Sequence, residues 1–535
     1  MKNFDSFGVM IDCSRNAVPN LDSLKHFFSV IAKMGYNCAM LYTEDTYEVQ
    51  NQPFFGYKRG RYSVEELREL DEFAESVGIE LIPCIQTLAH MNAALRWDAY
   101  RPFVDCDDIL LIGDDRTYAL IEDMFATLSS CIRSRRIHIG MDEAYRVGLG
   151  KYLREHGYQN RYDILLPHLQ KVCDIAKKYG YEALMWEDMF FRFASGNYFP
   201  EDDNAAPIVF PDDVRARIPD NLSMVYWDYY GEDEKRYDMM LESSKNLSDK
   251  VWFAGGTWCW GGFTPHNRLS IRRNTISIPA CRKHGVSNVL LTMWGDNGGE
   301  CTVWNMLPAL MHAAAMAEEL SEDEMKARFL DITGEHYDDM LALDLPNYVY
   351  GEDTDVWQSN FSKNRLFNDP LLRILDRNVK ETVDPARFAA YAERLRGLEK
   401  KSDNYDYLYA TQAALAEALA IKFDLGIRTH DLYRAGDKKA LRRLAKKDYT
   451  EFLRRLEAFY ETFRYQWYTD NKTYGFEVQD ARLGGLIWRT KSCRDRILEY
   501  CDGYVDAIPE LDEEVLENDG GNVGEWCKMI TACPI

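Results

Sequence analysis

Residues 162–186 read YDILLPHLQKVCDIAKKYGYEALMW, an amphipathic helical stretch that ends at Gly180 and leads at once into a short apolar run, EALMW. Glycine suits a helix C-terminus, and an unbroken apolar run of this length is typical of a parallel strand that is covered by helices. Similar runs recur along the first part of the chain. Eight of them predict strands, at residues 7–12, 38–43, 80–85, 136–141, 182–186, 222–230, 251–256 and 289–294.

Eight strands that alternate with helices favour a closed (β/α)₈ TIM barrel, an α/β fold, over an open doubly wound sheet. An open sheet should carry a glycine-rich phosphate turn after its first strand, and residues 11–20, IDCSRNAVPN, contain none. Ser63 and Glu66 form a capping-box pattern at the start of one predicted helix. We therefore predict that a (β/α)₈ barrel occupies residues 1–320.

The strand signal fades after this region. Residues 345–364, LPNYVYGEDTDVWQSNFSKN, predict a long polar and aromatic loop, and helical stretches such as 385–401 and 407–425 follow. The sequence therefore predicts a mostly α-helical C-terminal domain over residues 321–535. Its aromatic content is compatible with a homodimer.

The composition limits the classes of partner. The chain has 64 Lys and Arg residues against 87 Asp and Glu residues, a formal net charge of -23, which disfavours binding to nucleic acids or anionic membranes. The N-terminal residues lack the pattern of a secretory signal, and the sequence contains no apolar run of membrane-spanning length. Thirteen cysteines without a CxxC pair indicate reduced thiols. We therefore predict a cytoplasmic protein.

In a TIM barrel, functional side chains collect at the C-terminal ends of the strands. Those ends combine carboxylates and an arginine with several aromatic side chains. Aromatic faces stack on the C–H faces of a sugar and charged groups bind its hydroxyls, so the set predicts a carbohydrate pocket that requires no cofactor. The candidate residues are Asp12, Arg15, His90, His138, Asp142, Glu143, Trp186, Tyr226, Asp228, Trp258 or Trp260, Trp294 and Asp296.

Asp142 and Glu143 are adjacent, which limits the chemistry available to them. A conventional retaining glycosidase places two carboxyl groups about 5 to 5.5 Å apart around the scissile bond, and neighbours on one strand end fit that arrangement poorly. One carboxyl group could instead reach the leaving oxygen while the other holds a substrate group that attacks, such as a 2-acetamido oxygen. Adjacency leaves this open, because the pair could also cap the following helix.

The stretch HIGMDE, residues 138–143, resembles the H-x-G-x-D-E signature of glycoside hydrolase family 20, the β-N-acetylhexosaminidases. Further segments are similar over roughly residues 5–320. Because the first strand starts close to Met1, we expect the compact form that lacks the family's N-terminal α+β domain. The additional matching positions are Arg15 in DCSR, His90, Trp186, Tyr226 to Asp228, and Trp294 to Asp296.

The resemblance implies that Glu143 protonates the glycosidic oxygen and later activates water, while Asp142 orients the acetamide group. It implies that Tyr226 donates to the acetamide oxygen, that Arg15 and Asp228 hold distal hydroxyls, and that tryptophans surround the sugar. The implied enzyme is an exo-acting retaining β-N-acetylhexosaminidase. It would remove terminal β-linked GlcNAc or GalNAc from oligosaccharides by substrate-assisted catalysis through an oxazolinium intermediate.

Several alternatives remain open. A conventional retaining β-glycosidase with an enzymic nucleophile would cleave sugars without the acetamide group, and a non-catalytic sugar-binding barrel would have no need of a proton donor. A metal-dependent hydrolase would need His90, His138 and Asp142 to converge, and the HxH and HExxH motifs are absent, so no metal is predicted. Asp296 stands where the family has glutamate, which leaves the preference between gluco and galacto sugars undetermined.

Overall fold

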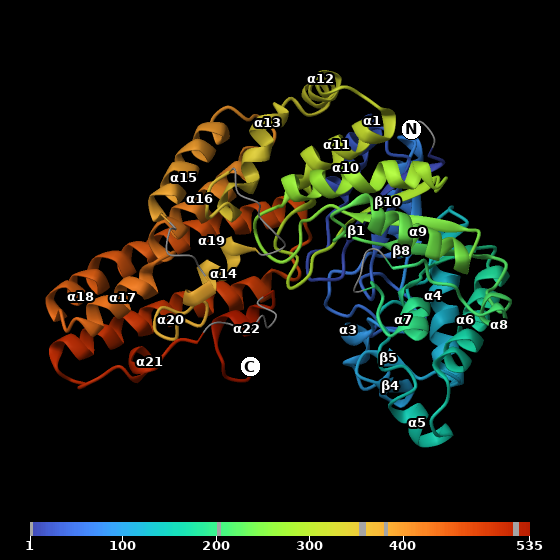
Figure 1. Cartoon of the computed structure of the whole chain (residues 1–535), viewed down its shortest axis with the longest axis horizontal. Helices are drawn as coiled ribbons and strands as arrows, with labels where there is room; N and C mark the ends of the chain where they lie inside the picture. The colour runs from blue at the N-terminus through green and yellow to red at the C-terminus, as the bar shows by residue number, and fades with distance from the viewer. Residues whose placement is uncertain (1–3, 201–204, 353–359, 379–383, 517–523) are drawn as a thin grey trace.

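Eight parallel strands close a barrel in the order β1-β10-β9-β8-β7-β6-β3-β2, as predicted (Figure 1). The computed structural model describes residues 4–200, 205–352, 360–378, 384–516 and 524–535. The barrel strands are β1 (Ser6–Asp12), β2 (Cys38–Tyr42), β3 (Glu80–Cys84), β6 (Arg136–His138), β7 (Glu182–Trp186), β8 (Leu222–Trp227), β9 (Val251–Gly256) and β10 (Asn288–Met293).

Helices pack against the outside of the barrel, and polar side chains cap the first turns of several of them. Asn20 accepts a hydrogen bond from the Ser23 amide, and Ser63 and Glu66 form the predicted capping box. The main outer helices are α1 (Leu21–Met34), α2 (Val64–Ser76), α4 (Asp115–Cys131), α6 (Arg161–Lys178), α7 (Asp188–Ser195), α9 (Glu234–Leu247), α10 (Asn267–Lys283) and α11 (Leu307–Glu318).

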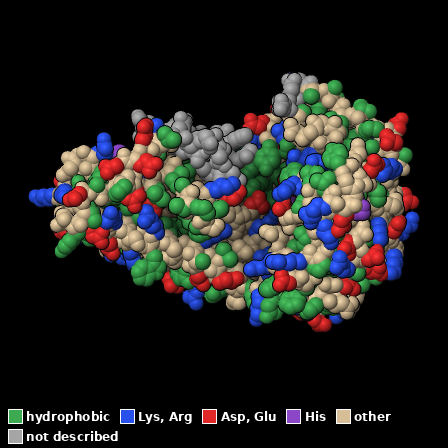
Figure 2. Space-filling model, turned by 90° about the horizontal axis from the view of Figure 1, so that it is seen from below, with side chains coloured by type: hydrophobic (Ala, Val, Ile, Leu, Met, Phe, Trp, Pro, Cys, Tyr) green, Lys and Arg blue, Asp and Glu red, His purple; other side chains and the backbone are tan. Residues whose placement is uncertain are grey.

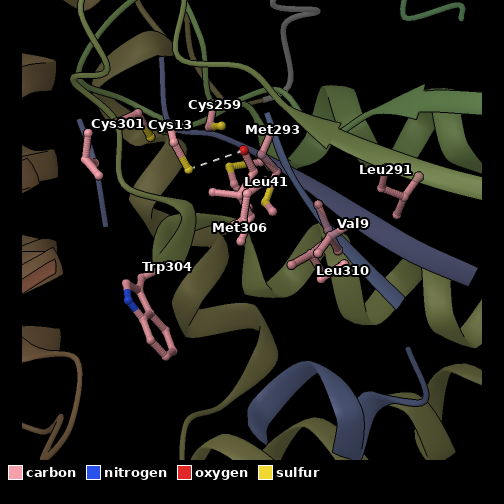
Figure 3. Close-up of a cluster of buried hydrophobic side chains, with 14 of the residues drawn as sticks. Val9, Cys13, Leu41, Cys259, Leu291, Met293, Cys301, Trp304, Met306 and Leu310 are labelled. Carbon is pink, nitrogen blue, oxygen red and sulfur yellow. Dashed lines mark hydrogen bonds between the residues drawn. The ribbon is translucent and has the colours of Figure 1, made fainter. Parts of the chain in front are cut away.

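Alternate residues of each strand pack on opposite sides of the barrel wall, as the two-residue period of a strand requires. Val9 of β1 and Leu291 of β10 belong to the outer layer, which also contains Leu310 of α11 (Figure 3). Met10 and Leu290 belong to a separate inner cluster that fills the barrel. The parity of a residue in its strand therefore decides whether it can reach the mouth of the barrel.

Two predicted strands end three residues earlier than expected. The strand predicted at 136–141 ends at His138, because Gly140 and Met141 adopt left-handed conformations with φ of 72° and 70°. The strand predicted at 222–230 ends at Trp227.

The rest of the chain is helical in its described parts (Figure 1). The prediction of a loop over 345–364 was wrong at its C-terminal end, since α14 begins at Phe361, and residues 353–359 lie outside the described residues. The domain boundary at residue 320 stays a prediction. The principal helices are α14 (Phe361–Phe367), α15 (Pro385–Glu399), α16 (Asp406–Lys422), α17 (Leu425–Arg434), α18 (Lys438–Leu444), α19 (Thr450–Asp470), α20 (Phe476–Asp502) and α22 (Trp526–Ile530).

All thirteen cysteines are unpaired. Within the described ranges, none of the helices combines the length and the apolar character needed to cross a membrane. On the face shown in Figure 2, basic and acidic side chains are interspersed. The predicted homodimer and the predicted cytoplasmic location stay predictions.

A buried charge cluster joins the loop after β10 to the C-terminal helices. The Glu300 carboxylate lies 2.6 Å from the Lys363 ammonium of α14 and 2.9 Å from the Arg482 guanidinium of α20. Lys363 and Arg482 also donate to the Asn297 carbonyl, at 3.2 and 2.6 Å. Because Lys363 and Glu300 are both buried, their charges are stabilised by one another and by Arg482 in place of water.

We predict that Lys363→Met lowers the free energy of unfolding by roughly 3–5 kcal/mol, because it leaves Glu300 buried with only one cationic partner. Urea-induced unfolding would measure the change. Lys283→Met is the matched control, because Lys283 pairs with Glu234 and Asp238 at the exposed surface and its loss should matter far less. Equal losses in the two variants would contradict the prediction.

Candidate active site

A cavity opens at the C-terminal ends of the barrel strands. The structure brings seven of the predicted residues together in its lining, with Trp260 as the alternative to Trp258 and four further aromatic side chains. The lining consists of Arg15, His90, Asp142, Glu143, Trp186, Trp294 and Asp296, together with Tyr42, Trp227, Tyr229, Tyr230 and Trp260.

The buried carboxylate of Asp12 holds one wall of this cavity. Its Oδ1 accepts hydrogen bonds from the amide and the hydroxyl of Ser14, at 2.8 and 2.7 Å. Its Oδ2 accepts from the Gly295 amide at 2.8 Å and from the Arg15 guanidinium at 3.1 Å. Asp12 therefore joins the end of β1 to the end of β10 and supports Arg15 without lining the cavity itself.

Arg15 presents its guanidinium group between aromatic rings and carboxylates. It lies 5.0 Å from the ring centre of Tyr42 and 5.5 Å from that of Trp294, and its Nε is 4.0 Å from the Asp296 carboxylate. A third carboxylate, Glu44, lies 3.5 Å away. The arrangement fixes a planar cation that can donate to ligand oxygens.

A left-handed turn carries Asp142 and Glu143 into the cavity. Glu143 has φ of 52°, and Gly140 is required because a Cβ atom there would lie 2.0 Å from the Gln86 side-chain oxygen. That oxygen accepts from the Met141 amide at 3.1 Å, and the Gln86 amide nitrogen donates to Asp142 Oδ1 at 2.8 Å. Residues 145–148 form a turn and the next helix, α5 (Lys151–His156), begins only after it, so the alternative in which the pair caps a following helix is wrong.

His90 holds both carboxylates from the loop after β3. Its Nε2 lies 3.2 Å from Asp142 Oδ2 and 3.7 Å from Glu143 Oε2. Burial alone would lower the pKa of His90, but the charge of Asp142 outweighs burial and raises the pKa to about 10. Burial would raise the pKa of Asp142, and His90 and Gln86 together lower it. The two residues therefore form an ion pair at neutral pH.

Comparison with known proteins gives two family matches. Residues 4–210 match the model described as "Glycosyl hydrolase family 20, catalytic domain", and residues 338–530 match the "Glycoside Hydrolase 20C C-terminal domain". The chain belongs to glycoside hydrolase family 20. The predicted family is thus confirmed, and the carboxylate pair lies in the segment that matches its catalytic domain.

The individual proteins that this chain resembles are distant from it in sequence. Hexosaminidase D from Bos taurus is 24% identical over 255 residues, which cover 46% of this chain and 68% of the bovine protein. Hexosaminidase D from Homo sapiens is 25% identical over 224 residues, 40% of this chain and less than half, 43%, of the human protein. The structure of the GH20 exo β-N-acetylglucosaminidase from Vibrio harveyi in complex with N-acetylglucosamine aligns with a TM-score of 0.44 at 15% identity, over 62% of this chain and 58% of that chain.

The family resemblance assigns Tyr226 and Asp228 to the sugar, but the structure does not place either side chain in the lining of the cavity. Both side chains are buried behind the cavity wall, where the Tyr226 hydroxyl donates to Asp228 at 2.9 Å and Arg236 pairs with Asp228 at 2.8 Å. The physical reason is that successive side chains alternate between the two sides of the barrel wall at the end of β8 and in the two residues that follow it. Trp227 and Tyr229, one residue out of phase, line the cavity instead.

His138 and Trp258 were also predicted to contact the ligand, and neither lines the cavity. His138 is buried at a ring distance of 4.4 Å from Trp186, its Nδ1 accepts from the Gly140 amide at 3.1 Å, and burial lowers its pKa to about 3. Trp258 lies behind Trp260, with which it stacks at 4.2 Å. Of the two tryptophans, Trp260 therefore faces the cavity.

The sequence-based interpretation missed Gln86 and the tyrosines of the lining. Gln86 comes two residues after β3 and, like Cys84, has the inward parity, which is a signal that the sequence contains. Tyr42 closes β2 with the same parity. No group of three or more His, Cys, Asp or Glu side chains suited to a metal ion occurs in the described part of the chain, so the ligands of the metal-dependent alternative do not converge there.

The ion pair between His90 and Asp142 predicts a pH dependence of stability. The folded-state pKa of His90, about 10, lies above its ordinary value of 6.5. The stabilisation is therefore complete below about pH 6.5 and is lost as the pH rises through 10. We expect the melting temperature of the wild type to fall more between pH 7 and pH 10 than that of His90→Gln.

Circular dichroism melts at fixed ionic strength would measure this difference. Asp142→Asn is the companion variant, because removal of the carboxylate charge should move the titration of His90 to lower pH. Parallel loss of stability in wild type and His90→Gln would rule out the charged pair.

Proposed function

We propose that the protein is an exo-acting, retaining β-N-acetylhexosaminidase that removes terminal β-linked GlcNAc or GalNAc from oligosaccharides by substrate-assisted catalysis. The observation that carries the proposal is the state of Asp142. It is ionised and both of its oxygens are engaged, Oδ1 by Gln86 and Oδ2 by His90. A carboxylate held in this way suits the stabilisation of a neighbouring positive charge better than attack on a sugar carbon.

The walls of the cavity fit a single pyranose. Trp186, Trp260 and Trp294 offer flat apolar surfaces for the ring and for an acetamide methyl group, while Arg15 and Asp296 offer a donor and an acceptor for distal hydroxyls. A pocket closed at its base by buried tryptophan favours the terminal residue of a chain over an internal one. This agrees with exo action.

In the first step, the acetamide oxygen of the substrate attacks the anomeric carbon and the glycosidic C–O bond breaks. Glu143 gives its proton to the departing oxygen, and Asp142 stabilises the positive charge of the resulting oxazolinium ion. In the second step, Glu143 takes a proton from water, and the water oxygen attacks the anomeric carbon. The bond from that carbon to the acetamide oxygen breaks, which opens the oxazolinium ring and restores the acetamide group. Two displacements at the same carbon retain its β configuration.

A hydroxyl donor to the acetamide oxygen is still needed, and we assign it to Tyr229 in place of Tyr226. Tyr229 lines the cavity, and burial raises its pKa well above the ordinary value, so its hydroxyl keeps its proton. A donor aimed at an oxygen that becomes part of the intermediate supports the first step.

The main test is hydrolysis of the 4-nitrophenyl β-glycosides of N-acetylglucosamine, N-acetylgalactosamine and glucose. We expect activity on the two N-acetyl sugars only, and a loss of about 10²- to 10⁴-fold in kcat for Glu143→Gln, because the proton donor is removed. Comparable hydrolysis of the plain glucoside would instead support the conventional mechanism, and sugar binding without turnover would support the non-catalytic alternative.

The assignment of Tyr229 predicts that Tyr229→Phe lowers kcat by about 10²-fold, the effect of removing one preorganised donor. Tyr226→Phe also removes a tyrosine hydroxyl, but from a side chain that does not line the cavity, and it should keep kcat close to that of the wild type. Steady-state kinetics on the N-acetylglucosaminide would measure both. A larger loss in Tyr226→Phe would restore the original assignment.

A further inference from the structure

The carboxyl group of Glu143 has a different partner at each oxygen. Oε2 faces His90 at 3.7 Å, on the side of Asp142. Oε1 accepts a hydrogen bond of 2.5 Å from the hydroxyl of Tyr145, two residues further along the chain. One oxygen is therefore engaged from outside the Asp142–His90 pair, and the other remains on the side where the sugar would bind.

The backbone of Glu143 is held as well. Its amide donates to Asp188 Oδ2 at 3.1 Å, at the start of α7. Asp188 is fully buried, and this hydrogen bond supports the left-handed conformation of Glu143, which a residue with a side chain rarely adopts. Without this hydrogen bond, the left-handed conformation that directs the Glu143 carboxyl group would be less stable.

Arg192 connects the two restraints. Its Nε donates to the same Asp188 oxygen at 3.2 Å, one helical turn further along α7. Its guanidinium lies 4.6 Å from the ring centre of Tyr145, within range of a cation–π contact. Arg192 therefore contacts the Tyr145 ring and also binds the Asp188 carboxylate, which accepts the hydrogen bond from the Glu143 amide.

We propose that Tyr145, held by Arg192 and Asp188, is a positioning residue that binds Glu143 Oε1 and so leaves Oε2 as the oxygen that transfers the proton to the leaving group. This inference rests on the proposed function of Glu143 as the acid. It adds an orienting contact on the side opposite His90, from residues outside the cavity lining.

Loss of the Tyr145 hydroxyl should have two consequences. The acid would sample more orientations, so proton transfer would suffer most for substrates whose leaving group needs a proton. The carboxylate would also lose a hydrogen-bond donor that stabilises its charged form, so the alkaline limb of kcat/KM should move to higher pH. The other charged or titratable groups near Glu143 are His90, Asp142, Asp188, Arg192, Tyr230 and Asp296.

The experiment compares wild type and Tyr145→Phe on the phenyl, 4-nitrophenyl and 2,4-dinitrophenyl β-N-acetylglucosaminides. The phenyl group is the poorest leaving group of the three and depends most on the acid. We expect kcat/KM to fall by about tenfold or more for the phenyl substrate, a fraction of the effect of a whole acid, and to change little for the dinitrophenyl substrate. The alkaline limb should shift upward in the same variant.

Arg192→Met provides a second route to the same result. It removes the contact with the Tyr145 ring, and the double variant should lose less than the two single losses combined, since both act through one carboxyl group. Tyr158→Phe, at a tyrosine that is 77% exposed, is the control and should behave as the wild type. Because burial raises the pKa of Asp188 to about 7, the pH profiles are repeated in an Asp188→Asn background to remove the titration of Asp188 from the profile.

Equal losses on all three leaving groups, with an unmoved alkaline limb, would show a general structural effect and overturn the proposal. A Tyr145→Phe enzyme indistinguishable from wild type would do the same. Failure of the proposed function is a separate result, because it would appear as absence of N-acetylhexosaminide hydrolysis in the wild type itself.

Discussion

The carboxylate of Asp12 is the contact on which the rest of the site depends. A barrel closes where its first and last strands meet, and here the buried Asp12 accepts hydrogen bonds from the loops that follow both β1 and β10. The same carboxylate pairs with Arg15, so a single side chain both joins the first and last strands and positions the guanidinium group of the cavity. Arg15 in turn lies beside Trp294 and Asp296, so the contacts between the ends of β1 and β10 determine this side of the cavity.

The opposite wall depends on backbone conformation. Two adjacent carboxylates on a regular strand would point to opposite faces, as Tyr226 and Trp227 do. The left-handed residues around Asp142 break that alternation, and both acids then reach the cavity. Gln86 and His90, both from the loop after β3, hold the resulting carboxylate in its charged form. The left-handed backbone conformations, which are unfavourable in themselves, are thus what brings both carboxyl groups into the cavity.

The architecture could be predicted from the sequence because its signals are local: apolar runs for the strands, amphipathic periods and caps for the helices. Arg15, His90 and Asp142 could be predicted because each lies in the loop that follows a barrel strand. Tyr226 and Asp228 could not be placed correctly, because a motif gives the order of residues and the phase of the strand decides which of them face inward. Trp260 could not be chosen over Trp258 for a related reason, since the chain has left β9 at that point and has no fixed alternation. The roles of Tyr145 and Asp188 arise from contacts with a neighbouring strand end and helix, which no local pattern encodes.

The C-terminal helices belong to the same physical argument. Asp296 is half exposed and its carboxylate is 4.0 Å from Arg15, so its position depends chiefly on its loop. The next carbonyls of that loop, Asn297 and Gly298, accept hydrogen bonds from Lys363, Arg482 and Gln479, and Glu300 pairs with the first two of these. The loop that carries Asp296 is therefore held through main-chain contacts with helices distant in sequence. The helices thus act on the pocket through the position of one loop, without contributing a side chain to its lining.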